Sequence, residues 1–278
     1  MTRAVWASSK RIGLYAALLA TTVAFLLPTL WIVSTSFKTP GEYFAFPPLW
    51  IPRRPTWEHY RLLFGEYGGM QYLRNSLIIS GGNTLLVLGL SIPAAYALAR
   101  YRVGGRALAF WILSQRMLPP IALVIPLFLL YAKLRLLDTF PGLILAYTIF
   151  NIPLAVWLLI GFFQDFPRDI QDQAMVDGCS ELGSVARVVL PVIAPGVTVV
   201  ALLTFTLCWN DLLLALTLTR SSTRTIMVFF TSALYAPTDV QYGSASASIV
   251  LGVTPAFILT LCGQRYLVRG LSMGGVKG

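Results

Sequence analysis

The sequence predicts an all-α integral membrane protein with six transmembrane helices. The chain has 278 residues, of which 56% are hydrophobic and only 12% are charged, whereas a soluble domain usually has about a quarter of its residues charged. The apolar residues gather in six runs. A helix that crosses a bilayer needs about 20 consecutive, mostly apolar residues. Within one membrane domain over 1–278, the predicted spans are about 12–33, 77–99, 107–131, 140–163, 192–218 and 246–263.

The first run resembles a secretory signal at first sight, because Arg3, Lys10 and Arg11 precede it. It is nevertheless long enough to span the membrane, and no clear small-residue cleavage site follows it. We therefore expect an uncleaved first span. The segment over 34–72 changes character, since it alternates charges with prolines and aromatic residues, and it is predicted to be an extramembrane loop.

The third run is unusual because it contains Gln115, Arg116 and the pair Pro119-Pro120. Arg116 lies roughly 14 Å along the helix, close to the middle of a hydrocarbon core about 30 Å thick. An ionisable residue at that depth usually faces protein or a wet cavity. Two roles remain open: Arg116 lines the path of a transported solute, or it pairs with a backbone carbonyl or a partner subunit. The two prolines are expected to kink or break the helix.

Other polar residues also interrupt apolar runs. Asn151 lies near the middle of the fourth span, and Asn210 and Asp211 lie toward the end of the fifth. Such groups should face protein or water. They either contact a solute in a path or hydrogen-bond between helices. The candidate path residues are thus Arg116, Asn151, Asn210 and Asp211.

Composition also argues against several functions. The net charge of +10 comes from basic residues scattered at the ends of apolar runs, which is typical of membrane flanks and not of a nucleic-acid site. One histidine, His59, and three dispersed cysteines make a metal centre or a catalytic site improbable. No Gly-x-x-x-x-Gly-Lys-Ser/Thr loop is present, so the chain is not expected to bind ATP through one.

The polar stretch over 165–191 stands apart from the membrane pattern. It carries five of the eleven acidic residues of the chain. Pro167 suits a first helical turn, Gly178 suits the end of that helix, and Ser180 is a plausible N-cap of a second helix. Apolar residues then follow at amphipathic helical spacing over 182–190. The pattern predicts a short helix, a glycine corner and a second helix. From spacing alone, an ordinary surface loop remains open.

The stretch resembles the conserved cytoplasmic loop of ABC-importer permeases. The pattern of that loop is Glu-Ala-Ala, three residues, Gly, nine residues, Ile, one residue, Leu-Pro. The matching positions here are Asp172, Gln173, Ala174, Gly178, Val188 and Leu190-Pro191. Three identities depart from the pattern: Asp replaces Glu, Gln replaces Ala and Val replaces Ile. In that family the loop is the coupling helix that docks on the ATPase subunit. The resemblance implies coupling roles for Asp172, Gln173, Ala174, Asp177 and Gly178, although Asp172 and Asp177 are alternatively helix caps.

The resemblance covers roughly residues 12–278 and is nearest to the smaller six-span permease of maltose-type sugar importers. Further similar segments are Ala94–Arg100, Phe150–Ala155, Trp209-Asn210-Asp211 and the tail from Gly270 to Gly278. It implies a type I ABC importer permease, without enzymatic activity, in the cytoplasmic (inner) membrane. The implied partners are a second permease, two ATPase subunits that bind ATP and Mg²⁺, an external sugar-binding protein and membrane lipids, with no nucleic acid.

Orientation rests mainly on this resemblance, which places both termini in the cytoplasm. Basic residues are only slightly more numerous on that side. Three alternatives remain: an ion-driven secondary transporter, for which no convincing internal repeat is seen, a membrane-embedded enzyme, and an ABC permease for a polyol or a glycerol phosphate derivative.

Overall fold

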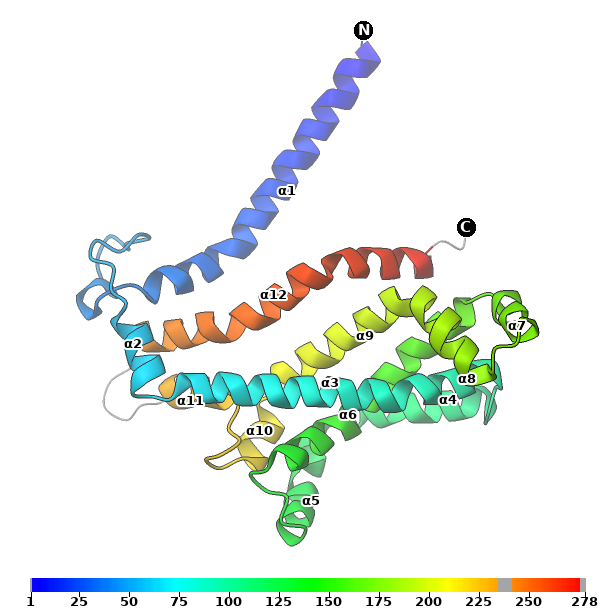
Figure 1. The fold of residues 1–278 in the computed structure, drawn as a ribbon. Helices are drawn as coiled ribbons and strands as arrows, with labels where there is room; N and C mark the ends of the chain where they lie inside the picture. Colours follow the sequence, from blue (N-terminus) through cyan, green and yellow to red (C-terminus); the bar gives the residue numbers. More distant parts are fainter. Residues whose placement is uncertain (1, 235–241, 276–278) are drawn as a thin grey trace. The chain divides into compact units, whose positions relative to one another are not determined.

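The computed structural model describes the backbone of residues 2–234 and 242–275 and the side chains of 13–231 and 242–264. Every regular element in this part of the chain is helical. The chain forms two compact units, which are described separately: unit 1 contains 1–70 and 230–253, and unit 2 contains 71–229 and 254–278. Figure 1 shows the elements coloured along the sequence.

Unit 1 begins with a long helix that matches the first predicted span. The elements that lie within it are α1 (Thr2–Thr35), η1 (Pro40–Glu42) and α2 (Glu58–Gly65). Helices α11 (Ile226–Leu234) and α12 (Tyr242–Gly275) each contribute residues to both units. The predicted loop over 34–72 is confirmed as mostly irregular, since its only helical parts are the last two residues of α1, η1, α2 and the first residues of α3.

His59 is a structural hydrogen-bonding residue of unit 1. It is buried, and its Nε2 lies 2.8 Å from the carbonyl oxygen of Lys38 and 3.1 Å from the hydroxyl of Tyr43. Its Nδ1 lies 3.4 Å from the hydroxyl of Ser244. The ring therefore ties the extramembrane loop to the first turn of α12. Among the described residues, no group of His, Cys, Asp or Glu side chains is arranged to hold a metal ion.

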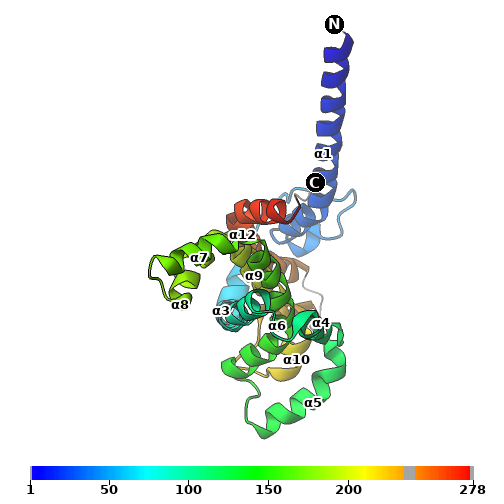
Figure 2. The same ribbon diagram turned by 90° about the vertical axis from the view of Figure 1, so that its right-hand side faces the viewer.

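Unit 2 contains most of the remaining helices. Its elements are α3 (Gly69–Arg100), α4 (Gly105–Ser114), η2 (Gln115–Met117), α5 (Pro120–Lys133), α6 (Phe140–Asp165), α7 (Arg168–Val176), α8 (Glu181–Ser184), the π-helix η3 (Val185–Val189), α9 (Leu190–Trp209) and α10 (Leu213–Leu218). Figure 2 shows the same elements from the side. In the described residues, five helices are long and apolar enough to cross a membrane, and α4 with α5 makes a sixth span if the bent pair counts as one.

The third predicted span is broken at its prolines, as expected. Helices α4 and α5 meet at an angle of 86°. Leu118 and Pro119 both precede a proline, and both have extended backbone, with ψ of 121° and 125°. A proline disfavours helical geometry in the residue before it, so two successive prolines force two extended residues. The fifth predicted span is likewise divided, into α9 and α10.

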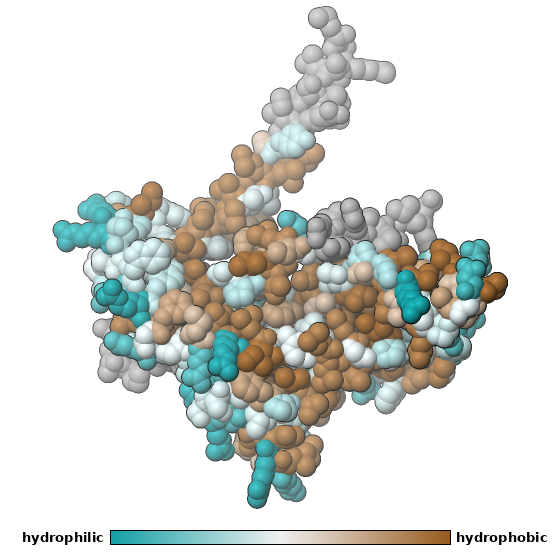
Figure 3. Space-filling view, viewed as in Figure 1, coloured by the Kyte–Doolittle hydropathy of each residue, from teal (hydrophilic) through white to brown (hydrophobic). Residues whose placement is uncertain are grey.

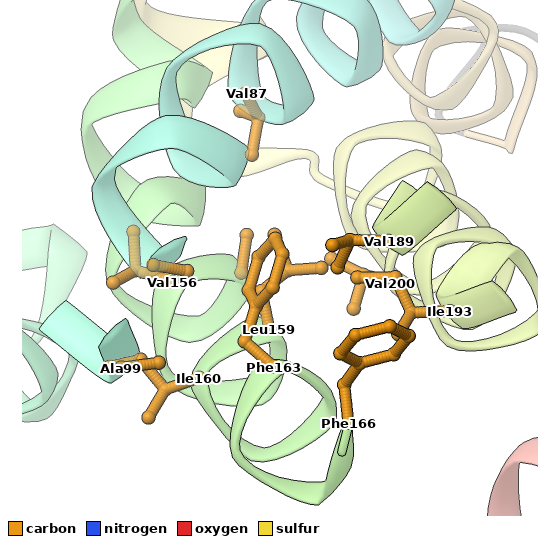
Figure 4. Packing of buried hydrophobic residues seen from close by; sticks show 12 residues of the cluster. Val87, Ala99, Val156, Leu159, Ile160, Phe163, Phe166, Val189, Ile193 and Val200 are labelled. Carbon is orange, nitrogen blue, oxygen red and sulfur yellow. The ribbon is translucent and has the colours of Figure 1, made fainter. Parts of the chain in front are cut away.

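The core of unit 2 lies between α3, α6 and α9. Figure 4 shows Leu159 and Phe163 of α6 between Val87 of α3 and Val200 of α9. Each of these side chains is at most 8% exposed. A second apolar cluster joins α5, α6 and α10. These two clusters hold together the helices that carry the predicted functional residues.

Large apolar side chains also cover the outside of unit 2. Examples are Leu85 of α3, Phe110 of α4 and Ile125 of α5, each about seven-tenths exposed. Figure 3 shows this apolar surface in brown, with hydrophilic residues gathered near α7 and near the tip of α5. A soluble protein rarely exposes so continuous an apolar surface, and it fits contact with lipid or with other membrane helices.

The turn between α5 and α6 is held by a carboxylate. Asp138 accepts hydrogen bonds at 3.0–3.1 Å from the backbone N–H groups of Arg220, Ser221, Ser222 and Thr223. Burial by itself would raise the pKa of the Asp138 carboxyl, but these hydrogen bonds, beginning with that of Arg220, lower the pKa well below its usual range. The carboxylate therefore stays ionised and anchors the loop that follows α10.

Replacement of Asp138 by asparagine is expected to loosen this loop. Asparagine tolerates the left-handed backbone at this position, where φ is 56°, but its amide group cannot accept the same bonds. We expect the free energy of unfolding to fall by about 2–3 kcal/mol at neutral pH. Thermal unfolding of the purified protein measures this loss, and Arg220→Gln is the control because Arg220 contributes its backbone N–H.

The pH dependence of this effect has a defined sign. The folded-state pKa of Asp138 lies below the unfolded value of about 3.9. The stabilisation is therefore fully present above that value and is lost as the pH falls toward the folded-state pKa. The difference between wild type and Asp138→Asn should be constant near neutral pH and shrink below about pH 4. A difference that does not change with pH would contradict the assignment.

Candidate coupling loop and intramembrane polar network

The loop over 165–191 has the predicted helix–corner–helix form. Gly178 ends α7 with a φ of +94°, a backbone conformation that favours glycine. The N–H of Gly178 donates to the carbonyl of Met175, and the N–H of Cys179 donates to that of Ala174. These two bonds form the Schellman end of a helix. The Ser180 hydroxyl accepts from the N–H of Gly183 at 3.2 Å, so the predicted N-cap is confirmed.

The apolar residues at the predicted amphipathic spacing over 182–190 are not all buried. Leu182 is 82% exposed and Ala186 is exposed, whereas Ser184, Val185 and Val189 are buried. The π-helix η3 follows α8 directly and changes the side-chain spacing from Val185 onward, whereas Leu182 lies in α8 before it. The i→i+5 bonds of η3 insert one residue per turn and rotate the side chains away from the spacing expected of an α-helix.

A buried glutamine fixes the loop to the end of α3. Gln171 is 2% exposed, and its Nε2 donates to the Tyr96 hydroxyl at 2.7 Å and to the Ser184 hydroxyl at 3.1 Å. The Tyr96 hydroxyl donates in turn to a carboxylate oxygen of Glu181 at 3.1 Å. Helices α3, α7 and α8 are therefore joined by one hydrogen-bond network.

An ion pair adds a second attachment. The guanidinium of Arg100, at the end of α3, lies 2.5 Å from a carboxylate oxygen of Asp172. Because the Asp172 side chain is 56% exposed, the pair contributes at most about 1 kcal/mol to stability. Its main effect is to orient α7. Asp172 is thus held by its own chain, while Asp177 takes the C-cap position of α7 and is exposed.

The outer surface of the loop is apolar as well as acidic. Val176 is 88% exposed, and Ile170 and Met175 are also exposed. Together with Leu182, these side chains form the surface that we call the loop's apolar face. Gln173 and Gly178 are exposed beside it, and Ala174 is half-buried. An extramembrane apolar face on a firmly attached loop is typical of a protein–protein contact site.

The intramembrane residues form a polar network between helices. Arg116 Nη1 donates to the carbonyl of Phe150 at 2.7 Å and lies 3.5 Å from Asn151 Oδ1. Asn151 Nδ2 donates to Asn83 Oδ1 at 3.0 Å, and Asn83 Nδ2 donates to the Thr148 hydroxyl at 2.9 Å. The network joins η2, α6 and α3.

Asn210 and Asp211 stand apart from this chain of hydrogen bonds. The Asn210 amide donates to the carbonyl of Thr206 in its own helix, and Asp211 Oδ1 accepts from the N–H of Leu214 at the start of α10. Asp211 nevertheless lies within electrostatic range of Arg116. The structure thus brings Arg116 and Asn151 into contact and places Asp211 near them. Whether any of these residues lines a path stays a prediction.

Sequence reasoning missed several residues of both sites. Gln171 gives no signal, because glutamine is not distinctive on an exposed helix. Tyr96 and Arg100 lie in the similar segment Ala94–Arg100, but nothing in the sequence indicates that they contact the loop. Asn83 carried the clearest signal, as a carboxamide inside an apolar span, which predicts a polar partner in another helix.

Comparison with known proteins gives consistent results. The profile of the family described as binding-protein-dependent transport system inner membrane component matches residues 88–273. The trehalose transport system permease protein SugB of Mycobacterium tuberculosis is 38% identical over 91% of this chain and 93% of its own length. The sulfoquinovosyl glycerol transport system permease protein SmoH of Agrobacterium fabrum is 36% identical over 91% of this chain and 89% of its own length.

A solved structure shares the fold. It is that of a bacterial ABC transporter involved in the import of the acidic polysaccharide alginate, and one of its chains superposes with a TM-score of 0.77. The match covers 93% of this chain and 97% of that chain at 22% sequence identity. The broken third span and the loop over 165–191 therefore belong to a fold that is known from experiment.

Proposed function

Because the chain belongs to the family of binding-protein-dependent transport system inner membrane components, and is thus a multi-pass permease subunit of an ABC importer, we propose that it imports a carbohydrate. Its relatives are named for the transport of trehalose and of sulfoquinovosyl glycerol. These names favour a sugar or a glycoside over a free polyol or a glycerol phosphate derivative. Family membership also favours an importer over an ion-driven secondary transporter.

In the proposed assembly, this chain and a second permease form the path in the cytoplasmic membrane, with both termini of this chain in the cytoplasm. An external binding protein delivers the sugar. Two ATPase subunits dock on the cytoplasmic side and bind ATP and Mg²⁺, for which this chain has no phosphate loop. The chemistry then belongs to the ATPase subunits, and this chain converts their motion into alternating access.

The observation that carries the proposed coupling to the ATPase subunits is the attachment of the loop over 165–191. Its apolar face is exposed to a partner, while Gln171, Asp172 and Glu181 bind the end of α3. The exposed side of such a loop can be moved by a bound partner. Because the other side is fixed to α3, the movement is passed on to α3. Closure of the ATPase dimer would move α7, and α7 would move α3 with it.

Charged substitutions on the apolar face test this proposal. Val176→Asp and Leu182→Asp each place a carboxylate where a docked subunit would have to desolvate it. We expect the yield of co-purified ATPase subunit to fall about tenfold or more in the double variant. Ile51→Asp is the control, because Ile51 is 81% exposed on the loop over 34–72. Full co-purification by the double variant would show that docking occurs elsewhere.

A further inference from the structure

A cavity of about 640 Å³ lies beside the coupling loop in unit 2. The end of α3, the start of α4, the end of α6 and the start of α7 surround it. Four arginines line it: Arg100, Arg102, Arg106 and Arg168. No aspartate or glutamate is among the lining residues. The cavity is therefore strongly cationic.

Three of these four arginines are exposed and form no ion pair with the described residues. Within the part of the chain that the structure describes, Arg100 is paired with Asp172, and no carboxylate pairs with Arg102, Arg106 or Arg168. Several guanidinium groups around one cavity repel one another unless an anion lies between them. Guanidinium groups match phosphate oxygens well, because their N–H donors form a planar fork. The lining thus favours a phosphate-bearing ligand.

The lining of the cavity also includes an apolar part. Ala109 of α4, Ile160 and Phe163 of α6 and Val189 of η3 contribute to it. A small inorganic anion would gain nothing from contact with these apolar side chains. A molecule with a phosphate head and a hydrocarbon body would contact both the arginines and the apolar side chains. The volume is within the usual range for a bound small molecule or headgroup.

The cavity lies beside the ends of three apolar helices, where a lipid headgroup would be expected. Helix α3 ends at Arg100, α4 begins at Gly105 and α6 ends at Asp165. We infer that the spans leave the membrane near these three termini, because their apolar runs give way to charged residues there. Basic pockets between membrane helices at this depth bind the headgroups of anionic lipids. An acidic side chain of a docked subunit would not need the apolar part of the lining.

We propose that this arginine-lined cavity binds the phosphate headgroup of an anionic phospholipid, phosphatidylglycerol being the probe, from the leaflet that borders the coupling loop. In assigning that leaflet to the cytoplasmic side, the proposal rests on the proposed function. The lipid phosphate neutralises Arg102, Arg106 and Arg168, and its acyl chains leave along α4 and α6. The bound lipid then stiffens the junction between α3, α4 and α7 on which coupling depends.

Native mass spectrometry of the purified complex with its partner subunits tests this. The complex is incubated in detergent with phosphatidylglycerol or with phosphatidylcholine. Wild type should retain phosphatidylglycerol, and Arg102→Gln/Arg106→Gln should bind it at least about tenfold more weakly. Arg53→Gln/Arg54→Gln is the matched control, because it removes the same charge from exposed arginines of the loop over 34–72. Phosphatidylcholine binding should be the same in all three proteins.

Competitors separate a lipid site from a simple anion site. Inorganic phosphate and glycerol 3-phosphate at millimolar concentration should not displace the lipid. Displacement by either, or equal retention of phosphatidylglycerol by wild type and the Arg102/Arg106 variant, would overturn the proposal. Binding only after removal of the ATPase subunits would also overturn it, because the cavity would then belong to the subunit interface.

Two further measurements keep the result interpretable. Arg102→Lys/Arg106→Lys preserves the charge of the cavity and should bind phosphatidylglycerol more weakly than wild type but more tightly than the glutamine variant. It replaces the glutamine variant in the test if that variant fails to fold. ATP-driven uptake by wild type is measured separately. Absence of uptake would contradict the proposed function but leave lipid retention unchanged, whereas lost retention with intact uptake would concern the lipid site alone.

Discussion

Replacement of Gly178 by proline is expected to abolish the coupling of ATP hydrolysis to transport. Proline fixes φ near −65°, whereas the corner requires +94°. It also removes the N–H that donates to the Met175 carbonyl at 3.1 Å. With the loss of about 3 kcal/mol or more at this corner, α7 and its apolar face should take another orientation. Substrate-stimulated ATP hydrolysis by the reconstituted complex should fall at least about tenfold.

A graded series shows whether backbone conformation is the cause. No atom lies within 4 Å of a Cβ built at Gly178, so a side chain meets no obstacle and only the positive φ matters. Asparagine tolerates positive φ better than alanine, and valine tolerates it least. Coupling should therefore decrease from glycine through asparagine and alanine to valine and proline. If proline couples as well as glycine, the corner is not part of the coupling mechanism.

Replacement of Asn151 by leucine is expected to have the second large effect. Asn151 is 5% exposed, and its amide donates to Asn83, which is fully buried. Leucine would leave the side-chain carbonyl of Asn83 without this donor. It would also remove the Asn151 oxygen that lies 3.5 Å from the Arg116 guanidinium. We expect a loss of about 1–3 kcal/mol in the free energy of unfolding, measured by thermal unfolding in nanodiscs.

A double-mutant cycle isolates the contact. Asn83→Leu and Asn151→Leu should be non-additive by about 0.5–1.5 kcal/mol, the range for hydrogen bonds between membrane helices. Additive losses would mean that the two amides do not depend on each other. Thr84→Val is a neighbouring control, because the Thr84 hydroxyl bonds the carbonyl of Ser80 in its own helix.

Arg116 requires a different comparison, since it has a structural and a transport interpretation. Arg116→Lys keeps the positive charge but removes the planar guanidinium group, which reaches both the carbonyl of Phe150 and the side chain of Asn151. If Arg116 lines the path, uptake should change while the unfolding temperature stays near that of wild type. If it serves only to join η2 to α6, uptake and unfolding temperature should fall together.

Local features of the chain were predictable from sequence because neighbouring residues determine them. The proline pair fixes the break between α4 and α5, Gly178 fixes the corner and Ser180 fixes the following N-cap. Each depends on backbone geometry over four or five residues. The membrane class followed from the scarcity of charge, which burial in lipid explains.

The contacts between residues far apart in the sequence were not predictable. Asp172 meets Arg100 across 72 positions, and Asn151 meets Asn83 across 68. Such partners depend on how whole helices pack. The exposed Ala186 shows a second limit, since it lies in the π-helix η3 and spacing rules assume the 3.6 residues per turn of an α-helix.

Helix α3 has a consequence for communication across the membrane. Near one end, the Asn75 amide donates to the carbonyls of Ser222 and Arg224 in the loop after α10. Near the other, Tyr96 is bonded to the coupling loop. Asn75 and Tyr96 are 21 positions apart in the helix, a rise of about 32 Å, which is close to the thickness of the hydrocarbon core. One uninterrupted helix is thus attached to a loop near each of its ends, so in the proposed transporter a displacement of the loop over 165–191 would reach the opposite end of the span through a single element.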